Sequence, residues 1–276
     1  MHYDPIKRSL GKVFNANPYM RKFFYRLLDL LLLRAWHIKK ELRLFSSDFK
    51  NKEIKILDAG AGFGQYVYSM SKFSPKWEIT AVDVKEEQVE DCNNFFDKIN
   101  ESHRINFEVG DLTKYRKEEE YQMILSVDVM EHILEDVVVF KNFYASLKPG
   151  GIVLISTPSD QGGSDADHDH DHEEGDIHGF IDEHVRDGYN IDEIVEKMKS
   201  AGFSKVEARY AYGTPGKISW KLSMKYPISM LNVSKLFFII LPIYFIITFP
   251  ISFILNYFDV NGKHKTGTGL VVKAFK

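Results

Sequence analysis

Short apolar runs alternate with longer, helix-compatible stretches through most of the chain. The runs are rich in Val, Ile and Leu, as buried strands are. Strands are expected at residues 54–58, 77–82, 105–109, 121–126, 152–156, 205–210 and 270–275, and helices at 65–73, 86–100 and 191–201. This alternation predicts an α/β fold with a parallel sheet covered on both faces. Ligands bind such sheets at the carboxyl ends of the strands.

A glycine-rich turn directly follows the first expected strand. Gly60, Gly62 and Gly64 remove three side chains, so the backbone can adopt positive φ values and approach a ligand closely. Asp58 lies beside the turn, where its carboxylate would repel a pyrophosphate but suit a cationic cofactor that carries an amino group and a sulfonium. The dinucleotide fingerprint places its third glycine at position 65, which is Gln65 here. An NAD-dependent dehydrogenase is therefore a weak alternative.

Further motifs follow this turn in a fixed order. Asp83 ends the second strand, where an acid can bind both ribose hydroxyls of a nucleoside. Asp111 follows the third strand, residues 121–133 give the fourth strand and the start of a helix, and a Pro-Gly-Gly turn at 147–151 precedes the fifth. With the Asp-x-Gly-x-Gly-x-Gly pattern, these features over residues 54–158 make the chain resemble the class I S-adenosylmethionine (SAM)-dependent methyltransferases.

The resemblance implies a complete fold and a cofactor site. The fold is a Rossmann-like, seven-stranded, mostly parallel sheet with helices on both faces and an antiparallel last strand, here with an N-terminal helical cap and an apolar helical insertion before that strand. SAM is the implied cofactor, with Asp111 near the adenine amino group. The expected cofactor-binding residues are Asp58, Gly60, Gly62, Gly64, Asp83, Val84, Asp111, Leu112, Ser126 and Val127.

Methyl transfer mainly requires that a nucleophile be aligned with the activated methyl and, where needed, lose a proton. The candidate catalytic residues are His132, His184 and Asp128. The stretch from Asp128 to His132 also resembles the Glu-x-x-Glu-His motif of quinone-pathway O-methyltransferases, in which these side chains can hold a divalent cation. Asp replaces the first Glu here, and no metal is predicted. For Glu131 we expect a structural or cofactor-proximal role.

Length and composition favour one domain with additions. The chain has 276 residues, 44% of them hydrophobic, which is enough for a large single core. Residues 1–48 are expected to form the cap and 49–276 the methyltransferase domain, with a flexible loop and lid at 160–190 and an apolar insertion at 211–265. The single cysteine, Cys92, excludes an intramolecular disulfide, and the start lacks the layout of a secretory signal. A cytoplasmic location is expected, at the cytoplasmic membrane face if the additions bind lipid.

The N-terminal region is strongly basic. Residues 1–45 hold ten basic and three acidic groups, a charge of +7, so the remainder carries −10 of the total of −3. The basic groups are Lys7, Arg8, Lys12, Arg21, Lys22, Arg26, Arg34, Lys39, Lys40 and Arg43. Interleaved with apolar residues, they indicate a basic amphipathic helix at a membrane surface. A helical cap over the cofactor cleft, with its bases in solvent, is an equal and compatible alternative. Nucleic-acid binding is disfavoured because no recognition motif is present.

Residues 236–255 form an uncharged run long enough to cross a membrane. A single crossing is disfavoured, because strands 205–210 and 270–275 in one sheet would hold both ends of the run on one side. Since Pro242 and Pro250 interrupt helices, we expect broken or kinked helices that dip into one leaflet or roof an apolar pocket. Nearby lysines at 221, 225, 235, 263 and 265 can bind lipid phosphates. A dimer interface or an extra core layer is the alternative.

The segment from Asp165 to Glu174 is rich in His and Asp and offers ligands for zinc or nickel. No spacing fixes a coordination geometry, so a flexible solvated loop is expected. The stretch 178–189 that follows is a candidate lid over substrate. Alternatively, Glu183 and Arg186 cap and pair at the start of the next helix.

These patterns together predict an enzyme that methylates a hydrophobic small molecule, such as a lipid, a quinone or a polyketide-like compound, near a membrane surface. Two alternatives stay open. One is a soluble methyltransferase for a small metabolite that dimerises through its apolar insertion. The other is a catalytically silent SAM-binding protein at a membrane. The sequence does not distinguish O-, N- and C-methylation.

Overall fold

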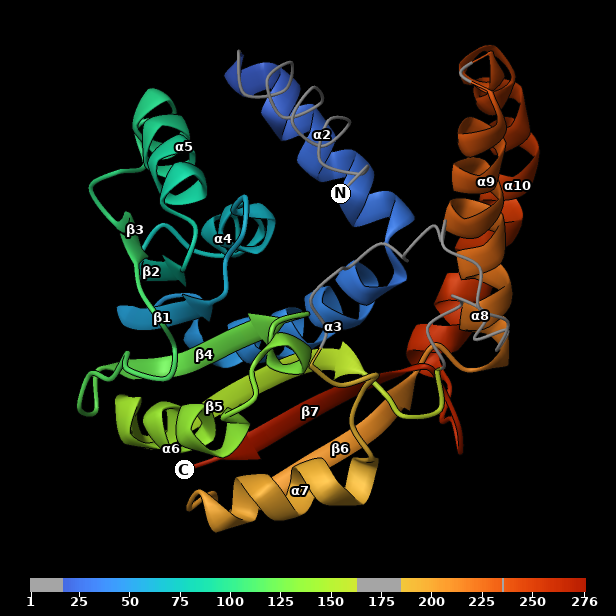
Figure 1. The fold of residues 1–276 in the computed structure, drawn as a ribbon. Helices are drawn as coiled ribbons and strands as arrows, with labels where there is room; N and C mark the ends of the chain where they lie inside the picture. Colours follow the sequence, from blue (N-terminus) through green and yellow to red (C-terminus); the bar gives the residue numbers. More distant parts are fainter. Residues whose placement is uncertain (1–16, 163–184, 235) are drawn as a thin grey trace, which may run out of the picture.

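A seven-stranded sheet organises the protein in its computed structural model, which describes residues 17–162, 185–234 and 236–276. The strand order is β3-β2-β1-β4-β5-β7-β6, and β7 runs antiparallel to both of its neighbours (Figure 1). The strands are β1 (Ile54–Ala59), β2 (Trp77–Asp83), β3 (Ile105–Val109), β4 (Tyr121–Val127), β5 (Leu147–Pro158), β6 (Lys205–Ala211) and β7 (Gly269–Phe275). The predicted fold class is confirmed.

Helices cover both faces of this sheet. They are α2 (Pro18–Leu31), α3 (Leu33–Phe49), α4 (Gln65–Ser71), α5 (Glu86–Lys98), α6 (Asp136–Ser146), α7 (Ile191–Ser200), α8 (Thr214–Trp220), α9 (Tyr226–Val233) and α10 (Phe237–Asn261), with a 3₁₀ turn η1 (Met130–His132) and a π-helical segment η2 (Lys221–Lys225). Side chains of α3, α4 and α5 share one core cluster, and those of α6 and α7 share the other. The expected boundary between a cap and a domain at residue 48 stays a prediction.

Two local expectations differ from the structure. The helix expected to begin directly after β4 is only the short turn η1, and α6 starts later, at Asp136. The turn expected at residues 147–151 lies within β5, where Gly150 has a φ of 76°. Here the chain end pairs with this segment, since Gly150 N–H donates to the Lys276 carbonyl (3.2 Å) and Lys276 N–H donates to the Gly151 carbonyl (3.1 Å). These long-range bonds extend the strand through the glycines.

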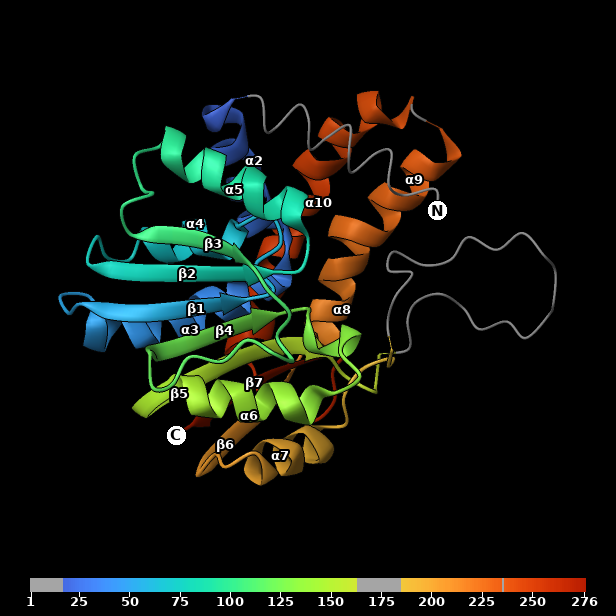
Figure 2. The same cartoon turned by 60° about the vertical axis from the view of Figure 1, so that its left-hand side comes forward.

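The apolar insertion forms a helical hairpin that projects from the sheet (Figures 1 and 2). Its outgoing arm is a rod of α8, η2 and α9, and its returning arm is α10. Because Ala211 pairs with Gly269, the hairpin leaves and rejoins the sheet at the same place. We expected broken or kinked helices here, and a break at the prolines is wrong, since α10 continues through Pro242 and Pro250; a kink stays a prediction. Packing along the rod supports it, for example through the Tyr244 hydroxyl, which donates to the Leu222 carbonyl (2.8 Å).

Candidate functional site

The glycine turn after β1 adopts the conformation that its sequence predicts. Gly60, Gly62 and Gly64 have φ values of 83°, 53° and 81°, which residues with a Cβ atom rarely adopt. The amides of Gly60 and Ala61 donate to the carbonyl of Val82 at 2.8 and 3.0 Å, which fixes the turn against β2. A Cβ atom added to Gly62 would meet no atom within 4 Å. At Gly62 the turn therefore presents bare backbone to an open space, whereas Gly60 and Gly64 lie against the side chains of Val129 and Phe107.

Asp58 is a buried acid one residue before the end of β1. Only 2% of the residue is exposed, and its Oδ2 atom has no hydrogen-bond partner in the described part of the chain. Burial, reinforced by the negative charge of Asp83, raises the pKa of Asp58 to about 8. A cation bound beside this carboxyl would favour its ionised form. The residue thus fits a positively charged cofactor, as expected from the sequence.

The next two strand ends present acids held by backbone amides. The Asp83 carboxylate accepts hydrogen bonds from Gly62 N–H (2.8 Å) and Lys85 N–H (3.0 Å), beside the exposed Val84. Asp111 accepts from the backbone and the hydroxyl of Thr113, at 2.9 and 2.7 Å, and these bonds lower its pKa. Because β1, β2 and β3 are parallel, Asp58, Asp83 and Asp111 lie at one edge of the sheet. Leu112 after β3 and Val127 at the end of β4 are buried.

Unpartnered polar atoms concentrate at the ends of β1 and β4. Of seven such buried atoms found in the described residues, five are Arg34 Nε, Asp58 Oδ2, Tyr66 OH, Ser126 Oγ and Glu131 Oε1. Burial raises the pKa of Tyr66 to about 12, and this hydroxyl interacts electrostatically with both Arg34 and Asp58. Buried polar groups normally have partners, so several unpaired ones in one region indicate a place built for a ligand.

Asp128, an expected catalytic residue, follows β4 with a φ of 52° and forms an ion pair with Arg34 of α3. The Arg34 backbone N–H donates to the hydroxyl of Tyr212 (2.9 Å), which ties the start of α3 to the end of β6. The carboxylate of Asp128 is thus paired with a cation. Arg34 is a candidate site residue that the sequence does not single out, because it is one of ten bases near the N-terminus and no motif marks it.

Glu131 and His132 lie in η1, beyond the end of β4. Glu131 is fully buried, accepts a hydrogen bond from the Thr157 hydroxyl (3.0 Å), and has a pKa raised by burial. His132 is half-buried. His184 and the His/Asp-rich segment lie outside the described residues. Within the described ranges, no group of three His, Cys, Asp or Glu side chains is arranged to hold a metal ion.

Helix α2 lies over the glycine turn and is fastened to it by a buried arginine. Arg21, 3% exposed, donates to the Phe63 carbonyl (2.9 Å) and to Cys92 Sγ (3.0 Å), and the Tyr25 hydroxyl also donates to the Phe63 carbonyl. Gln65, the residue after the turn, donates to Asp29 of α2 (2.9 Å). The contacts are those of a cap over the turn. The expectation that the N-terminal bases all face outward is wrong for Arg21.

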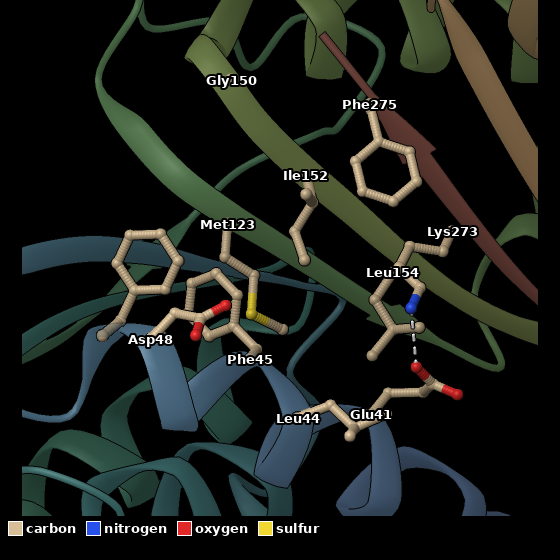
Figure 3. A pocket seen from close by; sticks show the side chains of 11 residues that line it. Glu41, Leu44, Phe45, Asp48, Met123, Gly150, Ile152, Leu154, Lys273 and Phe275 are labelled. Carbon is tan, nitrogen blue, oxygen red and sulfur yellow. Dashed lines mark hydrogen bonds and ion pairs between the residues drawn. The ribbon is translucent and has the colours of Figure 1, made fainter.

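The cavity in Figure 3 lies elsewhere, between α3 and the sheet. It is lined by Phe45, Met123 and Ile152, near the amino ends of β4 and β5, with an ion pair between Glu41 and Lys273 (2.9 Å) at its rim. The glycine turn lies at the opposite, carboxyl ends of the parallel strands. This cavity is therefore separate from the candidate site.

Comparison with known proteins points to one family. A family model described as a methyltransferase domain matches residues 50–202, more than half of the chain. A malonyl-[acyl-carrier protein] O-methyltransferase of Ilyobacter polytropus is 29% identical over 121 residues, which span 44% of this chain and 45% of that protein. The chain thus spans less than half the length of this curated relative.

Two solved structures share the fold. Phosphoethanolamine N-methyltransferase 2 of Haemonchus contortus in complex with SAM is 16% identical, with a TM-score of 0.56 over 86% of this chain and 52% of that one. A SAM-dependent methyltransferase of Mesorhizobium loti is 15% identical, with a TM-score of 0.52 over 88% of this chain and 100% of that one. At these identities the likeness concerns the fold alone.

Proposed function

The chain belongs to the methyltransferase domain family, and from this premise we propose that it transfers a methyl group from SAM to a hydrophobic small molecule, such as a lipid or a quinone, near a membrane surface. The open glycine turn beside the unpaired acid Asp58 is the observation that supports the cofactor. The apolar hairpin next to the site supports the class of acceptor. A cytoplasmic location, at the membrane face, is part of the same proposal.

In this proposal the residues at the strand ends hold the cofactor. The turn of Gly60, Gly62 and Gly64 admits it closely, Asp83 accepts hydrogen bonds from its ribose, and Asp58 lies beside its cationic part. When bound, SAM supplies a methyl group activated by a positively charged sulfur. The protein's own contribution is then to align the acceptor and, for an O–H or N–H acceptor, to remove a proton.

We assign acceptor binding to the polar cluster beyond β4, which consists of Arg34, Asp128, Glu131 and His132. Arg34 neutralises Asp128, so His132 is the better candidate for the proton-accepting group, and Glu131 supports η1 through Thr157. The cluster adjoins the base of the hairpin, because the Arg34 amide is bonded to Tyr212 and Tyr212 N–H donates to Asp259 of α10 (3.0 Å). An acceptor with a polar head and an apolar body would fit between these two surfaces.

The test is methyl transfer from isotopically labelled SAM into lipid and quinone extracts, with mass spectrometry to detect products heavier by about 14 Da, the mass of one CH₂ group that methylation adds, plus the mass of the label. We expect a labelled product in the lipid-soluble fraction. Products found only among polar metabolites would favour the soluble alternative. SAM binding without any product would favour a silent binder, and binding of NAD instead of SAM would refute the proposal.

Replacing Asp83 with alanine should weaken SAM binding about 10- to 100-fold, because the variant loses a charged acceptor for the ribose hydroxyls and the bond that holds Gly62. Isothermal titration calorimetry measures the change. Glu78→Ala is a matched control, since Glu78 is an exposed acid near the other end of the same strand. Equal affinity of the Asp83 variant and the wild type would exclude the ribose assignment.

A further inference from the structure

Helix α10 has its polar and apolar sides reversed relative to a helix in water. Its buried residues include Ser252, Asn256 and Asp259, and the Ser219 hydroxyl of α8 donates to Asn256 Oδ1 (2.6 Å). Its exposed large side chains are apolar: Phe238, Ile239, Ile240, Ile243, Ile246, Ile247, Ile251, Phe253, Ile254, Tyr257 and Phe258. A water-facing helix shows the opposite distribution. The outer surface of α10 is therefore suited to an apolar medium.

The width of this surface distinguishes a bilayer from a protein partner. At about 100° per residue, the exposed apolar residues from Phe238 round to Ile251 cover an arc of about 220°. A single packing partner needs a stripe of roughly 100°. Moreover, only 11% of the most apolar 18-residue window of α10 is buried. An environment that surrounds the helix on most sides fits this surface better than one helix of a second copy.

The position of the charges excludes a crossing. The helix is long and apolar enough to span a membrane by itself, but it returns from a rod that carries Lys217, Lys221 and Lys225. Because Ala211 and Gly269 are paired in the sheet, a crossing by α10 would carry these three lysines through the hydrocarbon as well. The lysines are spaced by four residues, and Ser219 and Ser223, which lie between them in sequence, are buried. The bases therefore form a stripe along one side of the rod.

We propose that α10 is a monotopic membrane helix, which lies along a single leaflet with its apolar arc in the acyl region and the lysine stripe of the rod at the level of anionic lipid phosphates. Interfacial helices bury their apolar face in this way, and bases near the surface strengthen binding to anionic lipids. For the origin of the acceptor, this inference rests on the proposed function: a lipid-soluble acceptor would reach the site from the leaflet.

The hairpin is also built to transmit its position to the site. Asp259 near the end of α10 accepts hydrogen bonds from His37 (2.9 Å), Tyr212 N–H (3.0 Å) and Gly216 N–H (3.0 Å), all within the protein. Trp36 of α3 packs edge-on against Phe253 with ring centroids 4.7 Å apart. Membrane contact by α10 would thus fix the orientation of α3, which supplies Arg34 to the site.

Flotation of the full chain with lipid vesicles tests the inference. We expect the protein to rise with vesicles of phosphatidylcholine and more strongly when phosphatidylglycerol is added. Ile243→Glu should weaken vesicle binding at least about tenfold, because it places a charge in the acyl region. Leu44→Glu is the matched control, since Leu44 is 57% exposed and Ile243 is 62% exposed, and Leu44 lines the separate cavity at the other end of the sheet. Equal losses in both variants, or no flotation of the wild type, would overturn the inference.

A measurement on the wild type alone avoids any folding defect of the variants. Backbone amide exchange should slow in α10 when vesicles are added and stay unchanged in α7. Protection of α10 by increasing protein concentration, without vesicles, would instead show a second copy as the occupant. SAM binding is titrated in parallel. If the wild type binds SAM but not vesicles, this inference is refuted and the cofactor assignment still holds.

Discussion

Asp58→Asn is expected to weaken SAM binding about 100-fold while it stabilises the ligand-free protein. The carboxyl group is buried, and its Oδ2 atom is unpartnered among the described residues. Its ionised form is therefore stabilised only when a cation is bound beside it. An amide has no charge to offer that cation. A 100-fold loss of affinity corresponds to about 3 kcal/mol of binding free energy. This is the size expected for a hydrogen-bonded charge interaction between two buried groups.

The same substitution should change the pH dependence. Because the folded pKa of Asp58 is raised from 3.8 to about 8, its contribution to stability is complete below the lower value and is lost as the pH rises through the higher one. The free energy of unfolding of the wild type should therefore decrease as the pH rises from 3.8 to about 8. The Asn variant should not show this decrease. SAM binding below pH 8 should release a proton from Asp58, so wild-type affinity should rise towards pH 8.

Calorimetry in two buffers of different ionisation enthalpy measures that proton, and thermal unfolding from pH 5 to 9 measures the stability slope. Asp48→Asn, which changes an exposed acid of α3, is the control and should behave as the wild type. A wild-type affinity for SAM that is independent of pH between 6 and 8 would contradict the assignment of Asp58 to the cationic part of the cofactor.

Asp259→Ala should lower the free energy of unfolding by about 3–5 kcal/mol, the range for breaking a buried charged network. Its carboxylate accepts hydrogen bonds from His37, Tyr212 N–H and Gly216 N–H, and alanine would leave these donors buried and unpaired. Denaturant unfolding measures the loss. Asp259→Asn keeps one carbonyl acceptor and should lose less, and a loss no larger in the alanine variant would show that the donors find other partners.

This network should also make the hairpin base sensitive to acid. Burial lowers the pKa of His37, and the positive charge of Arg209, which donates to the His37 Nδ1 atom (3.0 Å), lowers it further. The pKa of Asp259 is lowered as well, because the bond from His37 and the charges of His37 and His264 outweigh its burial. A group whose pKa is lowered in the folded state contributes stability at a pH above its ordinary pKa, which is about 6.5 for histidine. This contribution is lost as the pH falls through the pKa of the folded state.

Local patterns predicted most of the sheet and the strand ends at which the glycine turn and its neighbouring acids lie. The glycine turn and the acid at Asp83 are encoded by neighbouring residues, so their spacing was sufficient. By contrast, Arg34 and Asp128 are 94 residues apart, and no motif links a base in a predicted surface helix to a strand end. The buried Arg21 was misread for the same reason. The continuity of α10 through two prolines likewise depends on the rod beside it, which the rule for isolated helices does not consider.

The place of β7 in the sheet has a consequence for synthesis. This strand follows the other six in sequence but lies between β5 and β6, so the edges of β5 and β6 that it pairs with stay open until residues 269–275 have left the ribosome. By then the whole of α10 has already emerged, ahead of the strand that completes the sheet. During translation the most apolar helix is therefore exposed next to unpaired strand edges, the kind of surface on which nascent chains aggregate. A membrane or a chaperone that shields α10 at this stage would raise the yield of folded protein, and expression without either should give mainly aggregates.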